Sequence, residues 1–436
     1  MSEPTDLHEE PAPRVPVWRM LVRAAVIAAI VLGGTVATLF GMLGGLIIGG
    51  PKRARQIGYR AMVGTLQTLG PTFVKFGQTS STRKDTMSEG MAAAMGRLHD
   101  SVRPMSRRHR ERALREANLS QLVEVSRDPV ASGSIACVYQ GKLADGRVVA
   151  VKLKRPGIDR RMRTDLALAE SMMRGMQRMP NMRGMPMADL VGYVSKAILG
   201  QLDFGREARN ITHLRTCLRE VGQIRIPAVY PEVSAPNCLL FEYLPQLDVR
   251  TPSTLPADVR KALADRVLQA ANQMMFKDGF VHCDLHPGNV YLTPDQRVVI
   301  LDAGYCVHLP DRVRDLIGEF FECLAFGEGQ RCGQIVLESA VNPDPADADA
   351  FIAGMVDIVD RHAGPGKEFD MKVFGDEVFK LQQKHGIYAA SDFAFPLMSL
   401  NVLDGTVRGF YESVDFQQVG VAGRSAPRPS PQTRVA

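Results

Sequence analysis

Two carboxylates and one amide constrain the fold of this chain more than any other feature of its sequence. Asp284 is followed five residues later by Asn289, and Asp302 comes thirteen residues after that. Apolar, strand-like runs at 290–292 and 298–301 accompany them, so short strands would bring the three side chains together. In a phosphotransfer centre one carboxylate orients and deprotonates the attacking hydroxyl, while an amide oxygen and a second carboxylate hold Mg²⁺ against the ATP phosphates. The spacing therefore predicts an ATP and Mg²⁺ site, with Asp284 as the base and Asn289 and Asp302 as metal ligands.

The composition fits a folded, multi-part chain without an obvious nucleic-acid surface. The 436 residues are 45% hydrophobic and 23% charged, enough for two or three domains or for one large two-lobed domain with extensions. A formal net charge of +6 is modest for this length, and the basic residues are spread along the chain. A face near anionic lipid headgroups would explain the bias equally well. We expect no nucleic-acid partner.

The cysteines point to a reducing compartment. The chain has seven cysteines, an odd number, and no two of them form a CxxC pair. This pattern argues against a structural zinc site and against a disulfide framework. The simplest interpretation is a catalytic domain that faces the cytosol.

A membrane segment is predicted near the N-terminus, after a tail over residues 1–23. From Ala24 to Gly50 there is no charged residue, a stretch of 27. About 20 residues suffice to cross a hydrocarbon core, and the run is too long for a cleaved signal peptide. Its many glycines leave both a single span and a hairpin that dips into the bilayer open, and basic residues on both flanks leave the orientation undecided.

Small residues recur along one face of this predicted helix. Ala37, Gly41, Gly45 and Gly49 stand four residues apart and would allow close helix packing in lipid. They either make a homodimer contact or merely reflect how common glycine is in membrane helices.

Farther along, the chain predicts a β-hairpin and then several helices. The segments 134–143 and 148–153 flank Asp145-Gly146, a strong two-residue turn signal, and Lys152 on the return strand would face nucleotide phosphates. A strand over 239–245 would lead into a hinge; in a kinase, backbone groups at such a hinge, here around Glu242 and Leu244, hydrogen-bond the adenine. Helices are expected over 159–179, 188–220 and 259–277, and mostly helical structure over 311–415.

One further motif ties these parts together. Lys75-Phe76-Gly77-Gln78, with the polar run Ser81 to Asp85 after it, matches the KxGQ signature of the UbiB/AarF family of atypical, membrane-associated kinase-like proteins. The chain resembles that family over residues 55 to 415. The resemblance implies an α+β, two-lobed protein-kinase-like fold with a family-specific N-terminal helical extension, preceded by the transmembrane segment.

The resemblance also implies a division of the chain. The helical extension with the KxGQ motif would cover 52–128, a kinase-like N-lobe with a helical insertion 129–245, and the C-lobe 246–420. Residues 421–436, rich in proline, would form a disordered tail.

Several site residues follow from the same resemblance. The nucleotide loop would be Ala131, Ser132, Gly133, Ser134 and Ile135, which departs from the family's all-alanine form at Ser132 and Gly133. Lys152 would contact the α- and β-phosphates, with Glu207 as its ion-pair partner.

A lid is implied as well. In the family an acidic ExD signature meets the KxGQ lysine over the active site, but here its first position is Gln201, followed by Leu202 and Asp203. Since an amide carries no charge, a contact between Lys75 and Gln201 would be weaker than an ion pair. The expected lid therefore comprises Lys75, Gln78, Gln201 and Asp203.

The resemblance implies a membrane-associated atypical kinase or ATPase that binds Mg-ATP at the cell membrane, with its catalytic domain in the cytoplasm. It would support prenyl-quinone (ubiquinone or menaquinone) or isoprenoid lipid metabolism, with membrane lipids or quinone intermediates as partners. Two alternatives stay open. One is a non-catalytic lipid-binding or scaffold protein switched by nucleotide; the other is a small-molecule phosphotransferase of the aminoglycoside or choline kinase type, which shares the His-x-Asp-Leu-His-Pro-x-Asn loop.

Overall fold

The chain folds into two compact units. The computed structural model describes residues 15–75, 90–91, 94, 102–176, 187–247, 255–293, 295–340, 347–414 and 416. The N-terminal unit comprises residues 1–102 and 157–179, and the large unit comprises 103–156 and 180–436. Residues 157–179, expected as part of an insertion in the N-lobe, thus group with the N-terminal segment.

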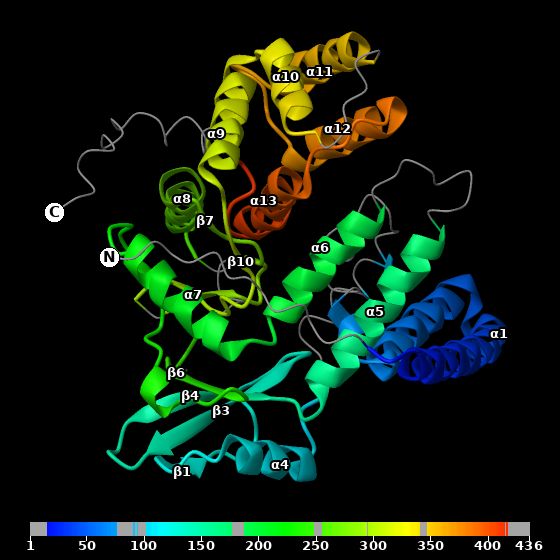
Figure 1. Cartoon of the computed structure of the whole chain (residues 1–436), viewed down its shortest axis with the longest axis vertical. Coiled ribbons are helices and arrows are strands. Elements are labelled where there is room, and N and C mark those ends of the chain that lie inside the picture. Colours follow the sequence, from blue (N-terminus) through cyan, green and yellow to red (C-terminus); the bar gives the residue numbers. More distant parts are fainter. Residues whose placement is uncertain are drawn as a thin grey trace. The chain divides into compact units, whose positions relative to one another are not determined.

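In the N-terminal unit, the predicted membrane helix belongs to a helical hairpin. Helix α1 (Val17–Leu69) is broken at Gly50, whose φ of 71° lies in the left-handed region, and Pro51 restarts the helix. Residues 17–49 form a first arm and residues 51–69 a second arm, drawn as the blue pair in Figure 1. The first arm is long and apolar enough to cross a membrane. Helix α5 (Ile158–Met176) packs on this hairpin.

The second arm packs against the glycines of the first arm. A β-carbon on Gly45 would lie 2.6 Å from Cδ1 of Ile57 and 3.3 Å from Cα of Ala54, and one on Gly34 would lie 2.5 Å from Oγ1 of Thr65. Glycine is therefore required for the arms to approach this closely. The face that we expected to offer a dimer contact is occupied by the same chain, so a homodimer through it would require the arms to separate.

The first lobe of the large unit is an antiparallel sheet with the strand order β1-β3-β4-β6, and β2 pairs with β3. The predicted hairpin at Asp145-Gly146 is confirmed, because Lys142 pairs with Val148 on its two sides and Gly146 has a φ of 89°. The strands are β1 (Leu122–Val125), β2 (Ala131–Ser132), β3 (Ala136–Leu143), β4 (Val148–Lys154) and β6 (Cys238–Glu242).

Alternation along the strands gives the sheet two different faces. Val151 and Leu153 of β4 are buried in a core with Ala113 and Ala117 of helix α4 (Arg107–Ala117). The residue between them, Lys152, points to the opposite face. That face is covered by α7 (Phe204–Cys217), whose Phe204 belongs to the other core of the unit together with Leu239. The sheet thus carries Lys152 toward α7.

The expected helix over 188–220 is interrupted. Helix α6 (Met187–Gly200) ends before a short turn, and α7 begins after Asp203, whose carboxylate accepts a hydrogen bond from the Arg206 N–H. Gly200 and Asp203 are good stop and start signals, which explains why the chain breaks here.

The second lobe combines short strands with helices, as Figure 1 shows in green to red. Two short sheets, β7–β10 and β5–β9–β8, carry the loops that hold Asp284, Asn289 and Asp302. The strands are β5 (Ile224–Arg225), β7 (Phe280–His282), β8 (Val290–Leu292), β9 (Val298–Ile300) and β10 (Cys306–His308). The helices are α8 (Ala257–Asn272), the π-helical η4 (Gln273–Asp278), α9 (Asp311–Phe326), α10 (Gly329–Glu338), α11 (Ala348–His362), α12 (Met371–His385) and α13 (Ser391–Phe410).

Candidate active site

Lys152 and Glu207 form a buried ion pair between the sheet and α7. The Nζ of Lys152 lies 2.6 Å from Oε1 of Glu207, although the two residues are 55 positions apart in the sequence. The carboxylate side chain is only 1% exposed. Because Asp203 caps α7 at its first turn, Glu207 is fixed in the helical turn that faces the strand. The structure therefore brings together the lysine and the glutamate that the family resemblance paired.

The same ammonium also reaches the second lobe. Nζ of Lys152 lies 3.2 Å from Oδ2 of Asp302, whose side chain is 50% exposed. The ring of Phe204 lies against the ammonium, with its centroid 5.4 Å from Nζ, a favourable cation–π distance. One lysine thus joins β4, α7 and the segment that carries Asp302.

The protonation states of this cluster follow from burial and charge. Burial raises the pKa of Glu207, and the nearby Asp302 raises it further, so that it reaches about 7 despite the opposing effect of Lys152. Burial by itself would lower the pKa of Lys152, but the two carboxylates outweigh burial and raise that pKa above its ordinary value. Lys152 therefore stays charged, whereas burial works against the charged form of Glu207.

The loop after β7 presents Asp284 and fastens it to Asn289. The amide Nδ2 of Asn289 donates to the carbonyl oxygen of Asp284 at 2.8 Å, and the N–H of Leu301 donates to the carbonyl of Asn289 at 2.9 Å. This ties the loop to the strand that leads to Asp302. Since the amide nitrogen is used as a donor, the amide oxygen of Asn289 is the atom suited to a metal.

Two histidines brace this loop. His282 is buried, and its Nδ1 accepts the N–H of Asp284 at 3.2 Å. Burial lowers the pKa of His282, which keeps the ring neutral in this accepting role. The Nδ1 of His286 accepts the N–H of Gly288 at 2.9 Å, and its Nε2 lies 4.0 Å from Oδ1 of Asp284. His286 thus points its second nitrogen at the expected base.

The backbone at Asp302 adopts an uncommon conformation. Its φ is 57°, and its Oδ1 accepts the N–H of Gly304 at 3.2 Å. Asn210 of α7 donates its Nδ2 to the carbonyl of the intervening Ala303 at 2.8 Å. Asn210 is a residue that sequence reasoning missed, because nothing in its local pattern marks a contact 93 residues away.

Arg155, also missed from the sequence, holds the expected nucleotide loop. Its guanidinium donates to the carbonyl of Gly133 at 2.9 Å and to Oγ of Ser132 at 3.1 Å, and its own N–H donates to the carbonyl of Ile135 at 2.9 Å. The loop also closes on itself, since the N–H of Gly133 donates to the carbonyl of Ala136 at 2.9 Å. Ala131 and Ser132 form β2, and Ser134 is buried.

Replacing Arg155 by Lys is expected to raise the KM for ATP about thirtyfold with little change in kcat, since two net hydrogen bonds of about 1 kcal/mol each are lost. A lysine ammonium cannot span the two acceptors that the planar guanidinium reaches. Steady-state ATP hydrolysis measures both constants. Arg147→Lys, at the hairpin turn on the same sheet, is the matched control, and an unchanged KM in Arg155→Lys would contradict a holding role for Arg155.

The expected hinge is anchored by its own side chains. Glu242, at the end of β6, accepts from Arg225 at 2.5 Å and from the N–H of Ala228 at 3.1 Å. Its carboxylate therefore fastens the strand, which leaves the backbone of the hinge as the part suited to an adenine. Leu244 follows β6 and is partly exposed.

The four residues of the expected lid lie in different parts of the structure. Gln201 is buried, and a β-carbon on Gly304 would lie 3.5 Å from its Cγ, so it packs against the Asp302 segment. Asp203 serves as the cap of α7. Lys75 belongs to the N-terminal unit, and Gln78 lies outside the described residues.

The donor set fits Mg²⁺ bound together with phosphates. Asp302 offers a half-exposed carboxylate and Asn289 an amide oxygen, the hard oxygen ligands that Mg²⁺ prefers. Within the described part of the chain, no three His, Cys, Asp or Glu side chains cluster as a metal cage. Mg²⁺ is commonly held by one or two carboxylates plus substrate phosphates.

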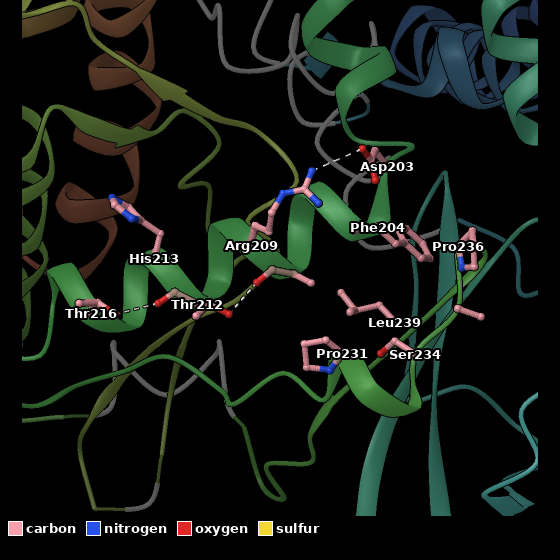
Figure 2. Close-up of a pocket in the computed structure, with 13 residues that line it drawn as sticks. Asp203, Phe204, Arg209, Thr212, His213, Thr216, Pro231, Ser234, Pro236 and Leu239 are labelled. Atoms are coloured by element: carbon pink, nitrogen blue, oxygen red, sulfur yellow. Dashed lines mark hydrogen bonds and ion pairs between the residues drawn. The ribbon is translucent and has the colours of Figure 1, made fainter. Parts of the chain in front are cut away.

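A separate cavity of about 660 Å³ lies beside α7, on the side of its Gly205, Ala208 and Thr212. Figure 2 shows α7 along one wall and Pro231, Ser234 and Leu239 on the other. Phe204, which touches the Lys152 ammonium, also lines this cavity. The cavity is thus next to the ion pair without containing it.

Comparison with known proteins places the site in a family. The sequence profile of the ABC1 atypical kinase-like domain matches residues 97–336. The chain is 32% identical over 249 residues to the probable protein kinase UbiB of Vibrio atlanticus, which is 55% of this chain and 46% of that protein. It is 25% identical over 363 residues to ACTIVITY OF BC1 COMPLEX KINASE 7, chloroplastic, of Arabidopsis thaliana, covering 81% of this chain. The match covers 52% of the Arabidopsis protein, so the chain spans about half the length of these two relatives.

The fold agrees with this assignment. A solved structure of Rv3197 from Mycobacterium tuberculosis, in complex with erythromycin, superposes with a TM-score of 0.53 and 19% identity, covering 80% of this chain and 92% of that one. The predicted two-lobed, kinase-like α+β fold is confirmed. The chain belongs to the UbiB/ABC1 family of atypical kinase-like proteins.

Proposed function

We propose that the protein is a membrane-associated, ATP-dependent enzyme of the UbiB type, an atypical kinase or ATPase whose catalytic unit faces the cytoplasm. Its role would be to support prenyl-quinone or isoprenoid lipid metabolism. The support for a lipid role is the family membership together with the apolar first arm of the N-terminal hairpin.

The observation that carries the proposal is the contact of one ammonium with two carboxylates. Lys152 lies 2.6 Å from Glu207 and 3.2 Å from Asp302 at the same time. A kinase site requires the strand lysine to be paired with its helix glutamate while the metal-binding aspartate is in place. A scaffold that had lost catalysis would have no need to keep one lysine in contact with both carboxylates.

Each residue then has a role in phosphoryl transfer. Bound Mg-ATP would supply the transferable phosphoryl group and its charge neutralisation, held by Asn289 and Asp302. Lys152 would bind phosphate oxygens, and Glu207 would keep it in place. Asp284 would accept the proton of the attacking hydroxyl or orient a water, with His286 beside it.

Asp284→Asn is expected to lower kcat for Mg²⁺-dependent ATP hydrolysis or transfer on the order of 10²–10⁴-fold, since a positioned acid or base contributes that much. The KM for ATP should stay nearly the same, because Asp284 is not among the phosphate-binding residues. The measurement uses the full-length protein with vesicles that contain anionic lipid. Asp265→Asn on the exposed side of α8 is the control.

Two results would change the proposal. If the wild-type protein binds nucleotide but hydrolyses it no faster than Asp284→Asn, the enzyme proposal is replaced by the first alternative. In that alternative the protein is a non-catalytic lipid-binding or scaffold protein that nucleotide switches. If ATP turnover requires an added aminoglycoside or choline, the protein is instead a small-molecule phosphotransferase. Profiling quinone intermediates in a deletion strain, complemented by wild type or by Asp284→Asn, tests the lipid role.

A further inference from the structure

Most exposed apolar side chains of the N-terminal hairpin lie on the first arm, whose two cations, Arg19 and Arg23, precede the charge-free run. The first arm exposes large apolar residues over most of its length; Phe40, Ile47 and Ile48 are 72%, 78% and 75% exposed. The second arm carries four exposed cations. These are Lys52, Arg53, Arg55 and Arg60. No acidic residue occurs between Pro11 and Lys84, so nothing within the hairpin neutralises these charges. Such a surface fits an apolar layer bordered by anionic groups.

The hairpin is also closed along its length. Gly34 meets Thr65 and Gly45 meets Ala54 and Ile57, while a β-carbon on Gly58 of the second arm would lie 3.0 Å from Sδ of Met42. The second arm therefore covers one face of residues 34–49, which is the middle and the end of the charge-free run.

The open end of the hairpin is fastened by buried polar contacts. Arg23, at the start of the charge-free run, donates to the carbonyl of Leu69 at 2.6 Å and to Oδ2 of Asp165 at 3.0 Å. Thr72 donates to the same carboxylate oxygen at 2.9 Å, and Arg161 donates to the carbonyl of Leu69 at 2.7 Å. Separating the arms would leave the buried Asp165 without the cation that compensates it.

A closed hairpin is a poor membrane span. Arg60 lies nine residues after Pro51. At about 1.5 Å per residue, this is about 13 Å from the turn. If the hairpin crossed a hydrocarbon core of about 30 Å, Arg60 would sit near its middle, where a charge is costly. If the hairpin only dipped its turn into the core, Lys52, Arg53 and Arg55 would be buried in lipid instead.

We propose that the closed hairpin lies in the plane of an anionic bilayer surface. The exposed face of the first arm sits among the upper parts of the acyl chains, and the cations of the second arm sit at the lipid phosphates. This inference rests on the membrane association proposed above and is independent of the ATP chemistry. The occupant of the surface is the lipid; a transmembrane first arm and a second copy of the chain are the competing arrangements.

The single tryptophan of the chain gives a direct test of depth. Trp18 is moved by making Trp18→Phe together with Phe40→Trp in the full-length protein, which places the only indole near the middle of the charge-free run. The protein is bound to phosphatidylcholine vesicles that contain phosphatidylglycerol. Lipids brominated near the glycerol end are expected to quench residue 40 more strongly than lipids brominated near the terminal methyl. Stronger quenching by the deep bromines would overturn the in-plane arrangement.

A cross-link reports whether the arms stay together. A β-carbon on Gly41 would lie 3.1 Å from Cγ2 of Ile57, so Gly41→Cys with Ile57→Cys should form a disulfide in solution and keep forming it on vesicles. Gly44 has no neighbour within 4 Å among the described residues, and Gly44→Cys with Ile57→Cys is the matched control that should not cross-link. Loss of cross-linking on vesicles would indicate an opened hairpin and contradict the proposal.

Charge removal tests the second arm. Arg55→Gln with Arg60→Gln should weaken partitioning to anionic vesicles by about fivefold per charge and leave the weak binding to neutral vesicles unchanged. Arg215→Gln with Arg219→Gln removes the same charge from exposed positions elsewhere and should change neither. If the Arg55/Arg60 variant and the wild type partitioned equally to anionic vesicles, the proposal would be overturned. It would also be overturned if the wild-type protein formed a dimer and did not bind vesicles. Because these readouts do not involve ATP, a loss of hydrolysis alone would contradict only the proposed enzyme activity.

Discussion

Asp302→Asn is expected to lower the rate of Mg²⁺-dependent ATP hydrolysis on the order of 10²–10³-fold. The substitution keeps the shape of the side chain but removes its charge, which serves two purposes at this position. The carboxylate is the charged ligand expected for Mg²⁺, and it also lies 3.2 Å from the Lys152 ammonium. The loss should therefore appear both as a lower kcat and as a higher Mg²⁺ concentration for half-maximal rate.

The comparison that isolates this effect is Asp357→Asn. Asp357 is an exposed aspartate on α11 that pairs with Arg361, far from any predicted site residue in the sequence. It should leave both the rate and the Mg²⁺ dependence unchanged. If Asp302→Asn retained wild-type hydrolysis with an unaltered Mg²⁺ requirement, the assignment of Asp302 as a metal ligand would be wrong.

Breaking the Lys152–Glu207 pair is expected to abolish activity and to cost about 3–5 kcal/mol in the free energy of unfolding, because one buried charge would be left without its partner. In Lys152→Met the remaining Glu207 has lost the ammonium that opposed its burial, so its pKa rises further above the value of about 7 in the wild type. An unfolded glutamate has a pKa of about 4.3, so stability is fully present below that value and is lost as the pH rises through the raised folded value. Lys152→Met should therefore be much less stable at pH 8 than at pH 5.

The double variant Lys152→Met with Glu207→Leu separates stability from catalysis. Removing both buried charges should recover most of the lost stability, since an apolar pair of similar volume replaces a buried ion pair at little or no cost. ATP hydrolysis should remain absent. Urea unfolding at pH 5 and pH 8 measures the first expectation, and a hydrolysis assay the second. The exposed pair Lys261–Asp265, changed in the same way, should show no comparable loss or recovery. If the double variant were as unstable as either single variant, the two side chains would not stabilise the fold as an ion pair.

The central residues of the site could be predicted because their signals are local. The position of Lys152 follows from alternation along a strand beside an Asp-Gly turn, and the spacing of Asp284, Asn289 and Asp302 follows from two short strands. The sequence also contains signals for the break between α6 and α7, namely Gly200 and the helix cap Asp203. Reading 188–220 as continuous missed these two signals.

Other features could not be read from local patterns. Arg155 and Asn210 act through hydrogen bonds to backbone carbonyls that are distant in sequence, and neither residue type nor spacing marks such contacts. Gly50-Pro51 is a turn signal after the apolar run that sequence reasoning did not use. That the second arm then packs on the glycines depends on the fit of Ile57 and Thr65 against them, which only the three-dimensional structure gives.

The left-handed backbone of Asp302 depends on contacts with other parts of the site. For a residue other than glycine this conformation costs on the order of 1 kcal/mol, although aspartate tolerates it better than most. Here it is held by the contact to Lys152 and by hydrogen bonds to Gly304 and from Asn210 to Ala303. Two of these contacts come from outside the segment, from Lys152 of β4 and from Asn210 of α7. Because Glu207 and Asn210 both belong to α7, a shift of this helix is expected to disturb the lysine contact and the Ala303 hydrogen bond beside Asp302 together.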